Sequence, residues 1–259
     1  MVSLFRKLRN KLAQKGVVKK YLSYALGEIA LIVLGIMIAV KINNSQENEK
    51  DRVIESLSLL EIKRGLESDL LDTQINIEVH QNAIESCDAI LNALSQALPF
   101  HDSLKVHFSR ALGYSRFISS IGAFESLKSR GLGIITNHKL REKITHYYDF
   151  RLKATKEWEE DFLSYLPIVK QFTLKHFDKT QVFAFNDLLP NSASEWFTDN
   201  IYGEMRPIDY KKLSKSEEYK HILRTLKANN IWVLNLNHKI QRDLLVELIS
   251  DIESEVRPE

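Results

Sequence analysis

The stretch YLSYALGEIALIVLGIMIAVKINN, residues 21–44, decides the fold predicted for this chain. A helix that rises 1.5 Å per residue needs roughly 20 mainly apolar residues to cross about 30 Å of hydrocarbon. The purely apolar run, Ile29 to Val40, is too short for this, so a span must also take in Glu28 on one side or Lys41 on the other. We therefore predict one transmembrane helix over residues 21–44, with Glu28 in the membrane or at its inner edge.

Glu28 shares one face of this helix with two small residues. At 100° per residue, Gly35 and Ala39 lie within about 20° of Glu28 around the helix axis. Small residues four apart let helices approach closely, and an ionisable side chain in a span generally faces protein or water. Glu28, Gly35 and Ala39 are thus a predicted membrane helix-packing face, for a second copy or another membrane protein. Alternatively, Glu28 is protonated or reaches the interface, and the small residues are ordinary span residues.

The charge distribution predicts the orientation of the span. The chain has a formal net charge of +2, yet residues 1–27 carry seven basic residues and no acidic one, which leaves a net −5 for the remainder. The positive-inside rule then places a basic arm, residues 1–20, in the cytoplasm and residues 46–259 in the periplasm, with the chain in the cell inner membrane. The acidic remainder lacks a domain-wide positive field, so nucleic acid is not an expected partner.

The ends of the apolar stretch favour an uncleaved anchor over a signal peptide. The stretch is long for a signal peptide, and residues 37–41, Met-Ile-Ala-Val-Lys, lack small residues at both positions of a cleavage site.

Cys87 is the only cysteine. An exported domain therefore has no intrachain disulfide, and we expect Cys87 to be buried and unreactive.

The blocks FRKLR (residues 5–9), GEI (27–29), LIVLGI (31–36), INN (42–44) and AFESLKSRGL (123–132) carry a family resemblance. They resemble an uncharacterised Bacteroidota membrane-protein family, domain of unknown function 6090, mainly over the first 150 residues. Members generally have Trp and Gln where this chain has Ser45 and Lys41. The resemblance implies a single-span topology and brings no activity, substrate or cofactor.

The remainder of the chain predicts an all-α fold, in which the membrane helix is followed by an elongated antiparallel helical bundle. Few Gly and Pro residues and long helical periodicities support this prediction. The first seam has steps of three and four residues, typical of supercoiled packing. It consists of Leu59, Ile62, Leu66, Leu70, Thr73, Ile77, His80, Ile84, Cys87, Leu91, Leu94 and Leu98, and we expect Pro99 to end this helix.

Further helices are predicted over residues 103–113, 119–130, 137–177 and 214–256. Asn137 is the expected N-cap of the third, Pro167 is expected to split it, and Ser214 with Glu217 forms a predicted capping box for the last. Residues 178–213 are predicted to be irregular but aromatic-rich. Within them Trp196, Phe197 and Tyr202 are a possible partner surface, because so many aromatic side chains in a loop should pack on protein.

No nucleophile or nucleotide-binding motif occurs in the chain, so the search for chemistry reduces to metal ligands. His138, Glu142 and His146 share a helix face, and Glu218 with His221 has a Glu-x-x-His spacing. A row of three such residues spans about 12 Å, too far for one ion, and a dimetal bundle requires two Glu-x-x-His motifs. We therefore predict no metal or cofactor, and regard these residues as a solvated helix face. Glu157, Glu159, Glu160 and Asp161 are likewise expected in solvent, with Trp158 packed.

Three functional hypotheses remain open from the sequence. The first is a membrane-anchored, non-enzymatic helical module that binds a partner or senses an envelope condition. The second is a metal-dependent enzyme in the helical bundle, and the third is a structural spacer in an envelope complex. The first is preferred because it uses the span, the Glu28 face and the aromatic segment together.

Overall fold

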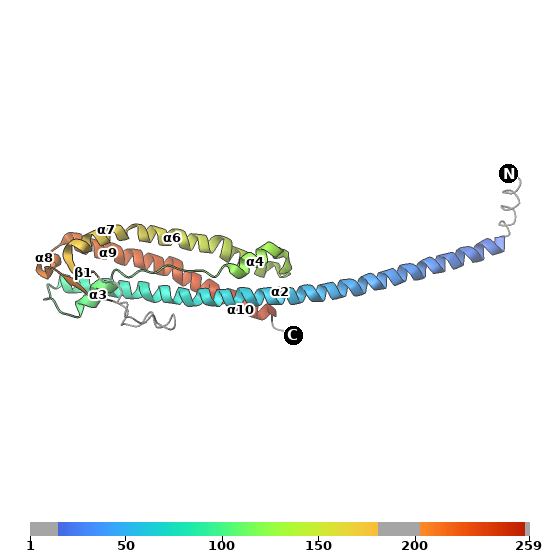
Figure 1. The fold of residues 1–259 in the computed structure, drawn as a ribbon, viewed down its shortest axis with the longest axis horizontal. Helices are drawn as coiled ribbons and strands as arrows, with labels where there is room; N and C mark the ends of the chain where they lie inside the picture. Colours follow the sequence, from blue (N-terminus) through green and yellow to red (C-terminus); the bar gives the residue numbers. More distant parts are fainter. Residues whose placement is uncertain (1–14, 181–202, 257–259) are drawn as a thin grey trace, which may run out of the picture. The chain divides into compact units, whose positions relative to one another are not determined.

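The computed structural model describes residues 15–180 and 203–256 (Figure 1). These residues are mainly helical, with one short pair of strands and a few irregular connections, which confirms the all-α prediction. They divide into two units, one up to Glu55 and one from Ser56 onwards. Most of the predicted basic arm, and all three residues of the predicted partner surface, Trp196, Phe197 and Tyr202, lie outside the described residues.

The longest helix, α2 (Lys15–Ser95), contains both the candidate span and the predicted packing seam. It has an 18-residue window with a mean hydropathy of 2.3, of which nothing is buried, so this helix is long and apolar enough to cross a membrane. Glu28, Gly35 and Ala39 are exposed on it, and a Cβ at Gly35 would meet no atom within 4 Å.

The C-terminus of α2 differs from the prediction. The helix ends at Ser95, because Ala97 takes a left-handed φ of 53° and the Leu98 N–H returns to the Ala93 carbonyl, 3.0 Å away. This hydrogen bond closes the helix in the manner of a Schellman motif, ahead of Pro99. Leu98 is therefore exposed and does not belong to the packing seam.

Five helical elements follow as the sequence predicted, with shorter bounds. They are α3 (Leu104–Arg110), α4 (Gly122–Arg130), α5 (His138–His146), α6 (Leu152–Ser164) and α7 (Leu166–His176). A 3-10 turn, η1 (Leu132–Ile134), precedes α5, and a π-helical segment, η2 (Tyr147–Arg151), joins α5 to α6. The Asn137 side chain caps α5 by accepting from the Leu140 N–H at 3.2 Å, and Pro167 lies in the first turn of α7, just after the break between α6 and α7, so both predictions are confirmed.

The prediction of an irregular segment over residues 178–213 is wrong at its two ends. Strand β1 (Phe177–Thr180) pairs antiparallel with β2 (Met205–Pro207), and a short helix, α8 (Tyr210–Ser214), follows. Phe177 and Met205 are buried in the core, so this pairing satisfies backbone groups that would otherwise be buried without partners.

The last predicted helix consists of α9 (Glu217–Trp232), the π-helical segment η5 (Val233–His238) and α10 (Lys239–Val256). The predicted capping box is wrong by two residues. Ser216 is the N-cap of α9, and its hydroxyl accepts from the Tyr219 N–H at 3.1 Å, whereas Ser214 is the last residue of α8.

Three helical runs lie side by side in the unit that begins at Ser56 (Figure 1). The first is the C-terminal part of α2, the second is α5 to α7, and the third is α9 to α10. The first and second point in the same direction and the third points the opposite way, so the predicted antiparallel arrangement holds only for the third run. The chain returns from α3 to α4 through residues 113–121, here called the connecting segment, which has no regular secondary structure. Nine extended residues cover about 30 Å, which is why so short a segment suffices.

Two hydrophobic cores occupy the two ends of this unit. One core contains Leu59, Ile62 and Leu66 of α2, the buried apolar residues between Phe124 and Tyr148, and Leu245, Leu248 and Ile252 of α10. The other gathers Cys87, Ile90 and Leu94 of α2 with Phe172, Phe177, Tyr219 and Leu226. Cys87 is fully buried and burial raises its pKa to about 12, which confirms its predicted inert environment.

Candidate functional site: a buried polar layer

A layer of buried polar side chains separates the two hydrophobic cores. Each helical run contributes one block to it, at residues 69–80, 151–159 and 230–241. We name as the polar layer the following buried residues: Asp69, Thr73, Asn76, His80, Arg151, Thr155, Glu159, Asn230, Asn237, His238 and Gln241. A buried polar group is costly unless it is paired, so a layer this large calls for a functional explanation.

One half of the layer is a connected set of hydrogen bonds. Arg151 Nη2 donates to both the backbone oxygen (2.5 Å) and the side-chain oxygen (2.9 Å) of Asn237. The Thr155 hydroxyl lies 2.9 Å from that side-chain oxygen and 2.7 Å from Gln241 Oε1, and Gln241 Nε2 donates to the Thr73 hydroxyl at 3.1 Å. These bonds tie all three helical runs together at one level.

Both π-helical segments meet the layer, because Arg151 ends η2 while Asn237 and His238 end η5. A π-helical turn contains an extra residue compared with an α-helical turn, so it redirects the side chains that follow it. Such turns are rare and occur frequently at functional sites. Here two of them face one another through the Arg151–Asn237 pair.

Carboxylates fasten the connecting segment to the helices. Asp69 Oδ1 accepts from the Ser120 N–H at 2.6 Å, and Asp72 Oδ2 accepts from the Ile118 N–H at 3.0 Å. Glu159 Oε1 accepts from the Phe117 N–H at 2.9 Å. Two helical runs thus hold one extended backbone through three acidic side chains.

Burial raises the pKa of all three carboxyl groups. It raises the pKa of Glu159 to about 7, although the hydrogen bond from Phe117 acts in the opposite direction. It also raises the pKa of Asp69 and of Asp72, against the hydrogen bonds that each receives from the connecting segment. Glu159 therefore exchanges its proton near neutral pH, where an ordinary glutamate would be ionised.

Two histidines occupy the other half of the layer. His80 and His238 stack with ring centroids 5.2 Å apart, and His80 Nδ1 lies 2.6 Å from Asn230 Oδ1. His238 Nε2 is 3.9 Å from Glu159 Oε1, beyond hydrogen-bonding distance, and neither nitrogen of His238 has a hydrogen-bond partner among the described residues. Burial lowers the pKa of His80, and burial with the neighbouring His80 lowers that of His238 to about 3. Both imidazoles are held neutral.

A cleft of about 550 Å³ lies beside the connecting segment. Phe117 and Ser119 of that segment line one side, and Tyr148, Thr155 and Glu159 line the other. The cleft therefore gives the carboxyl group of Glu159 a route to solvent, although the residue itself is only 7% exposed. Protons can reach this part of the layer without unfolding of the helices.

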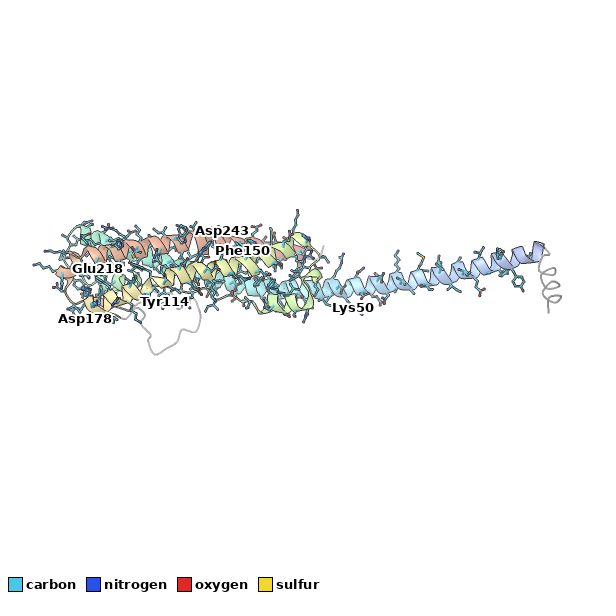
Figure 2. The ribbon with its side chains drawn as sticks, turned by 90° about the horizontal axis from the view of Figure 1, so that it is seen from above. Lys50, Tyr114, Phe150, Asp178, Glu218 and Asp243 are labelled. Carbon is cyan, nitrogen blue, oxygen red and sulfur yellow. The ribbon has the colours of Figure 1, made fainter. Side chains whose placement is uncertain are left out.

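The residues that the sequence singled out as metal ligands are not part of the layer. His138 and Glu142 are paired at 3.4 Å but are about two-thirds exposed, and His146, Glu218 and His221 are exposed as well. Figure 2 shows Glu218 on the outside of the helices. Within the described residues, no group of three His, Cys, Asp or Glu side chains could hold a metal ion.

Sequence reasoning found only part of the layer. It placed Thr73 and His80 in the seam of α2, and both are buried. It placed Glu159 in solvent with its acidic neighbours, and this prediction is wrong because Glu159 lies under the connecting segment. Asp69 and Asn76 were missed, although strict steps of three and four from Leu66 would have reached both.

Comparisons of the chain with protein-family models, with curated proteins and with solved structures found no match. The family resemblance described above therefore stays a prediction, and the functional argument rests on the polar layer.

Proposed function

We propose that the chain is a membrane-anchored, non-enzymatic helical module that senses a condition of the cell envelope, and that the condition is proton concentration. The observation that supports this is the polar layer, in which two buried imidazoles, one of them without a hydrogen-bond partner, lie beside a carboxyl group whose pKa is raised to about 7. A buried cluster of this kind is a common basis for a pH-dependent conformational change.

The direction of the response follows from proton linkage. If the layer opens to water, His80 and His238 regain ordinary pKa values near 6.5, so opening takes up protons between that pH and their lowered values. Glu159 acts in the opposite sense, because its raised pKa falls on opening and a proton leaves. Asp69, Asp72, Arg116 and Arg151 also lie around these groups. Asp69 and Asp72 act in the same sense as Glu159, because burial raises their pKa as well. In the proposal the two imidazoles outweigh these carboxyl groups, so acidification favours the open layer.

The same helix that carries the candidate span also supplies Asp69, Thr73, Asn76 and His80 to the layer. In the proposal, residues 46–259 form a helical domain in the periplasm and residues 1–20 form a cytoplasmic arm. The response is passed to a partner, which binds in the inner membrane at the face of Glu28, Gly35 and Ala39. Cysteine cross-linking at Gly35 and Ala39 in native membranes tests this face, and a chain that stays monomeric and uncross-linked would disprove it.

The single native cysteine provides the main test. Cys87 is fully buried, so its reaction with 4,4′-dithiodipyridine in the full chain, reconstituted in lipid nanodiscs, reports opening next to the layer. The rate is divided at each pH by that of the denatured chain, which removes the pH dependence of the thiol itself. We expect this ratio to rise as the pH falls from 7 to 5.

Variants identify the groups responsible for the rise. His238→Phe keeps an aromatic ring stacked on His80 but does not titrate, so it should make the rise shallower. Glu159→Gln removes the opposing proton and should make it steeper. His221→Gln, at an exposed histidine of α9, is the matched control and should behave as the unmodified chain. A ratio that stays constant from pH 8 to 5 in the unmodified chain would refute the proposal.

A further inference from the structure

A second hollow, of about 310 Å³, lies between α6 and α9. It is lined by Trp158, Asp161 and Phe162 of α6, by Asn229 and Trp232 of α9, and by Val233. Trp158 and Phe162 are four residues apart, and Asn229 and Trp232 are three apart, so each helix presents both members of its pair on one face. The hollow is therefore built by two helices that face each other with aromatic side chains.

Trp232 is 58% exposed, so more than half of this large apolar side chain is left uncovered by the fold. Trp232 also lines the hollow, so its indole is available both to the hollow and to solvent. Tryptophan is the side chain that attracts cations most strongly through its ring face, at distances up to about 6 Å from the ring centroid. Trp158 already makes one such contact, with Arg151 Cζ 5.2 Å from its ring centroid.

Asp161 is the charged residue among those that line the hollow. Both signs of charge occur elsewhere on α6, where Glu157 and Glu160 as well as Lys153 and Lys156 are exposed, and the buried Arg151 lies against the Trp158 ring. The nearest basic residue in sequence to Asn229 is Lys227, and its ammonium group is paired with Asp88 at 2.5 Å. Two indoles, one phenyl ring and one carboxylate thus surround a space that favours positive charge.

We propose that this hollow binds a small organic cation, such as a quaternary or alkylated ammonium compound. The rings of Trp158, Trp232 and Phe162 contact its alkyl groups and its charge, and Asp161 supplies the counter-charge. The Asn229 amide adds a polar contact for a hydroxyl or carbonyl group elsewhere on the ligand. An aromatic cage with an acidic residue recognises such ligands because it replaces the weak hydration of a diffuse cation by ring faces.

The hollow adjoins the polar layer without sharing its titrating groups. Trp232 is the last residue of α9 and Val233 is the first residue of η5, while the Phe162 ring packs edge-on against His80 at 5.5 Å. A cation held between Trp158 and Trp232 therefore joins α6 to the start of η5. The proposal goes beyond proton sensing and rests on different residues, so either one can fail without the other.

Calorimetric titration of the full chain tests the proposal. The chain is reconstituted in nanodiscs of phosphatidylglycerol, because lipids or detergents with choline headgroups would compete. Choline and tetramethylammonium are titrated, with 3,3-dimethylbutan-1-ol as a neutral compound of the same shape as choline. We expect saturable binding of both cations, and binding of the neutral compound weaker by about tenfold or more.

Two variants and two matched controls locate the site. Trp232→Leu and Asp161→Asn should each weaken choline binding by about three- to tenfold. Phe150→Leu removes another exposed aromatic side chain and Asp243→Asn another exposed carboxyl group, both labelled in Figure 2, and neither should change binding. Circular dichroism and the pH response of Cys87 report whether each variant remains folded.

Three results would overturn the assignment. Equal affinity for choline and the neutral compound would show that positive charge is not recognised. Saturable binding that Trp232→Leu leaves unchanged would place the cation elsewhere on the chain. No binding of either cation, together with self-association that Trp232→Leu abolishes, would instead make the hollow an interface between two copies of the chain.

Discussion

Arg151 and Asn237 join the two π-helical segments directly, since Arg151 Nη2 donates to the Asn237 backbone oxygen at 2.5 Å and to its side-chain oxygen at 2.9 Å. The guanidinium group is buried, and burial lowers the pKa of Arg151 while the neighbouring Tyr147 raises it. A cation in this position depends on its few acceptors, because water cannot replace them.

Removing one partner of this pair should therefore be costly. We expect Asn237→Ala to destabilise the chain by about 3 kcal/mol, because it removes a hydrogen-bond acceptor from a buried charge. Thermal unfolding of the full chain in nanodiscs, followed by circular dichroism, measures the effect. Arg242→Ala is the matched control: Arg242 pairs with its neighbour Asp243 at the surface, and its loss should change stability by less than about 0.5 kcal/mol. Equal effects of the two substitutions would contradict the expected role of the Arg151–Asn237 pair.

Glu159 should make the chain more stable in mild acid. Its folded-state pKa of about 7 lies above the ordinary value of 4.5, so the folded chain binds the extra proton between these two pH values. The stabilisation is absent above pH 7 and complete below about pH 4.5, on the order of 2 kcal/mol. Glu159→Gln should remove this stabilisation. The unfolding temperature of the variant should then gain less than that of the unmodified chain as the pH falls from 7 to 4.5. An unchanged profile in this variant would mean that Glu159 is ordinarily ionised.

His238 should act in the opposite direction. Its folded-state pKa of about 3 lies below the ordinary 6.5, so the unfolded chain binds the extra proton between those values. Stability is therefore lost as the pH falls below 6.5, by up to about 3 kcal/mol near pH 3. His238→Phe should retain stability over that range when the unfolding temperature is compared at pH 7 and pH 5. If the two chains lose the same stability, the imidazole is hydrated in the folded state.

The connecting segment passes close to α2 at Gly65. A Cβ there would lie 3.2 Å from the Ser120 backbone oxygen and 3.6 Å from the Tyr148 hydroxyl. Gly65→Val should cost about 2 kcal/mol and should also speed proteolysis within residues 113–121, because a larger side chain displaces the segment. Gly122→Ala, where nothing lies within 4 Å of the new atom, should be neutral or slightly stabilising.

The N-cap of α9 is Ser216 in the structure, whereas the sequence predicted Ser214. Ser216→Ala should cost about 1 kcal/mol, because the Ser216 hydroxyl accepts from the Tyr219 N–H at the helix start. Ser214→Ala should cost little, since that hydroxyl bonds within α8 at the surface. Unfolding temperatures of the two variants provide the comparison, and the reverse order would restore the predicted capping box.

Helix positions were predictable because capping and breaking residues act locally. Asn137 and Pro167 work through their own backbone, so their roles follow from a few neighbouring residues. The choice between Ser214 and Ser216 was harder, since Ser214 has Glu217 at capping-box spacing, whereas Ser216 is followed directly by Glu217 and Glu218. The pairing of β1 with β2 depends on residues far apart in sequence, which no local pattern reports.

Most of the polar layer was not predicted from the sequence, because the buried face of α2 was assigned from its apolar residues. Leu70 and Ile77 were chosen, whereas the neighbouring Asp69 and Asn76 are more deeply buried. A carboxylate becomes acceptable inside the protein only through distant partners, here the Tyr147 hydroxyl at 2.6 Å and the Ser120 N–H. Those partners follow from the path of residues 113–121 and from the two π-helical segments, neither of which has a simple sequence signal.

The polar layer also divides the protein thermodynamically. The hydrophobic cores on its two sides share few apolar contacts, so each can lose structure with its own cooperativity. We expect calorimetry to resolve two unfolding transitions, with the core around Cys87 melting separately from the core around Tyr147. One core can then unfold while the other stays folded, and this half-folded chain is an intermediate between the folded and unfolded states.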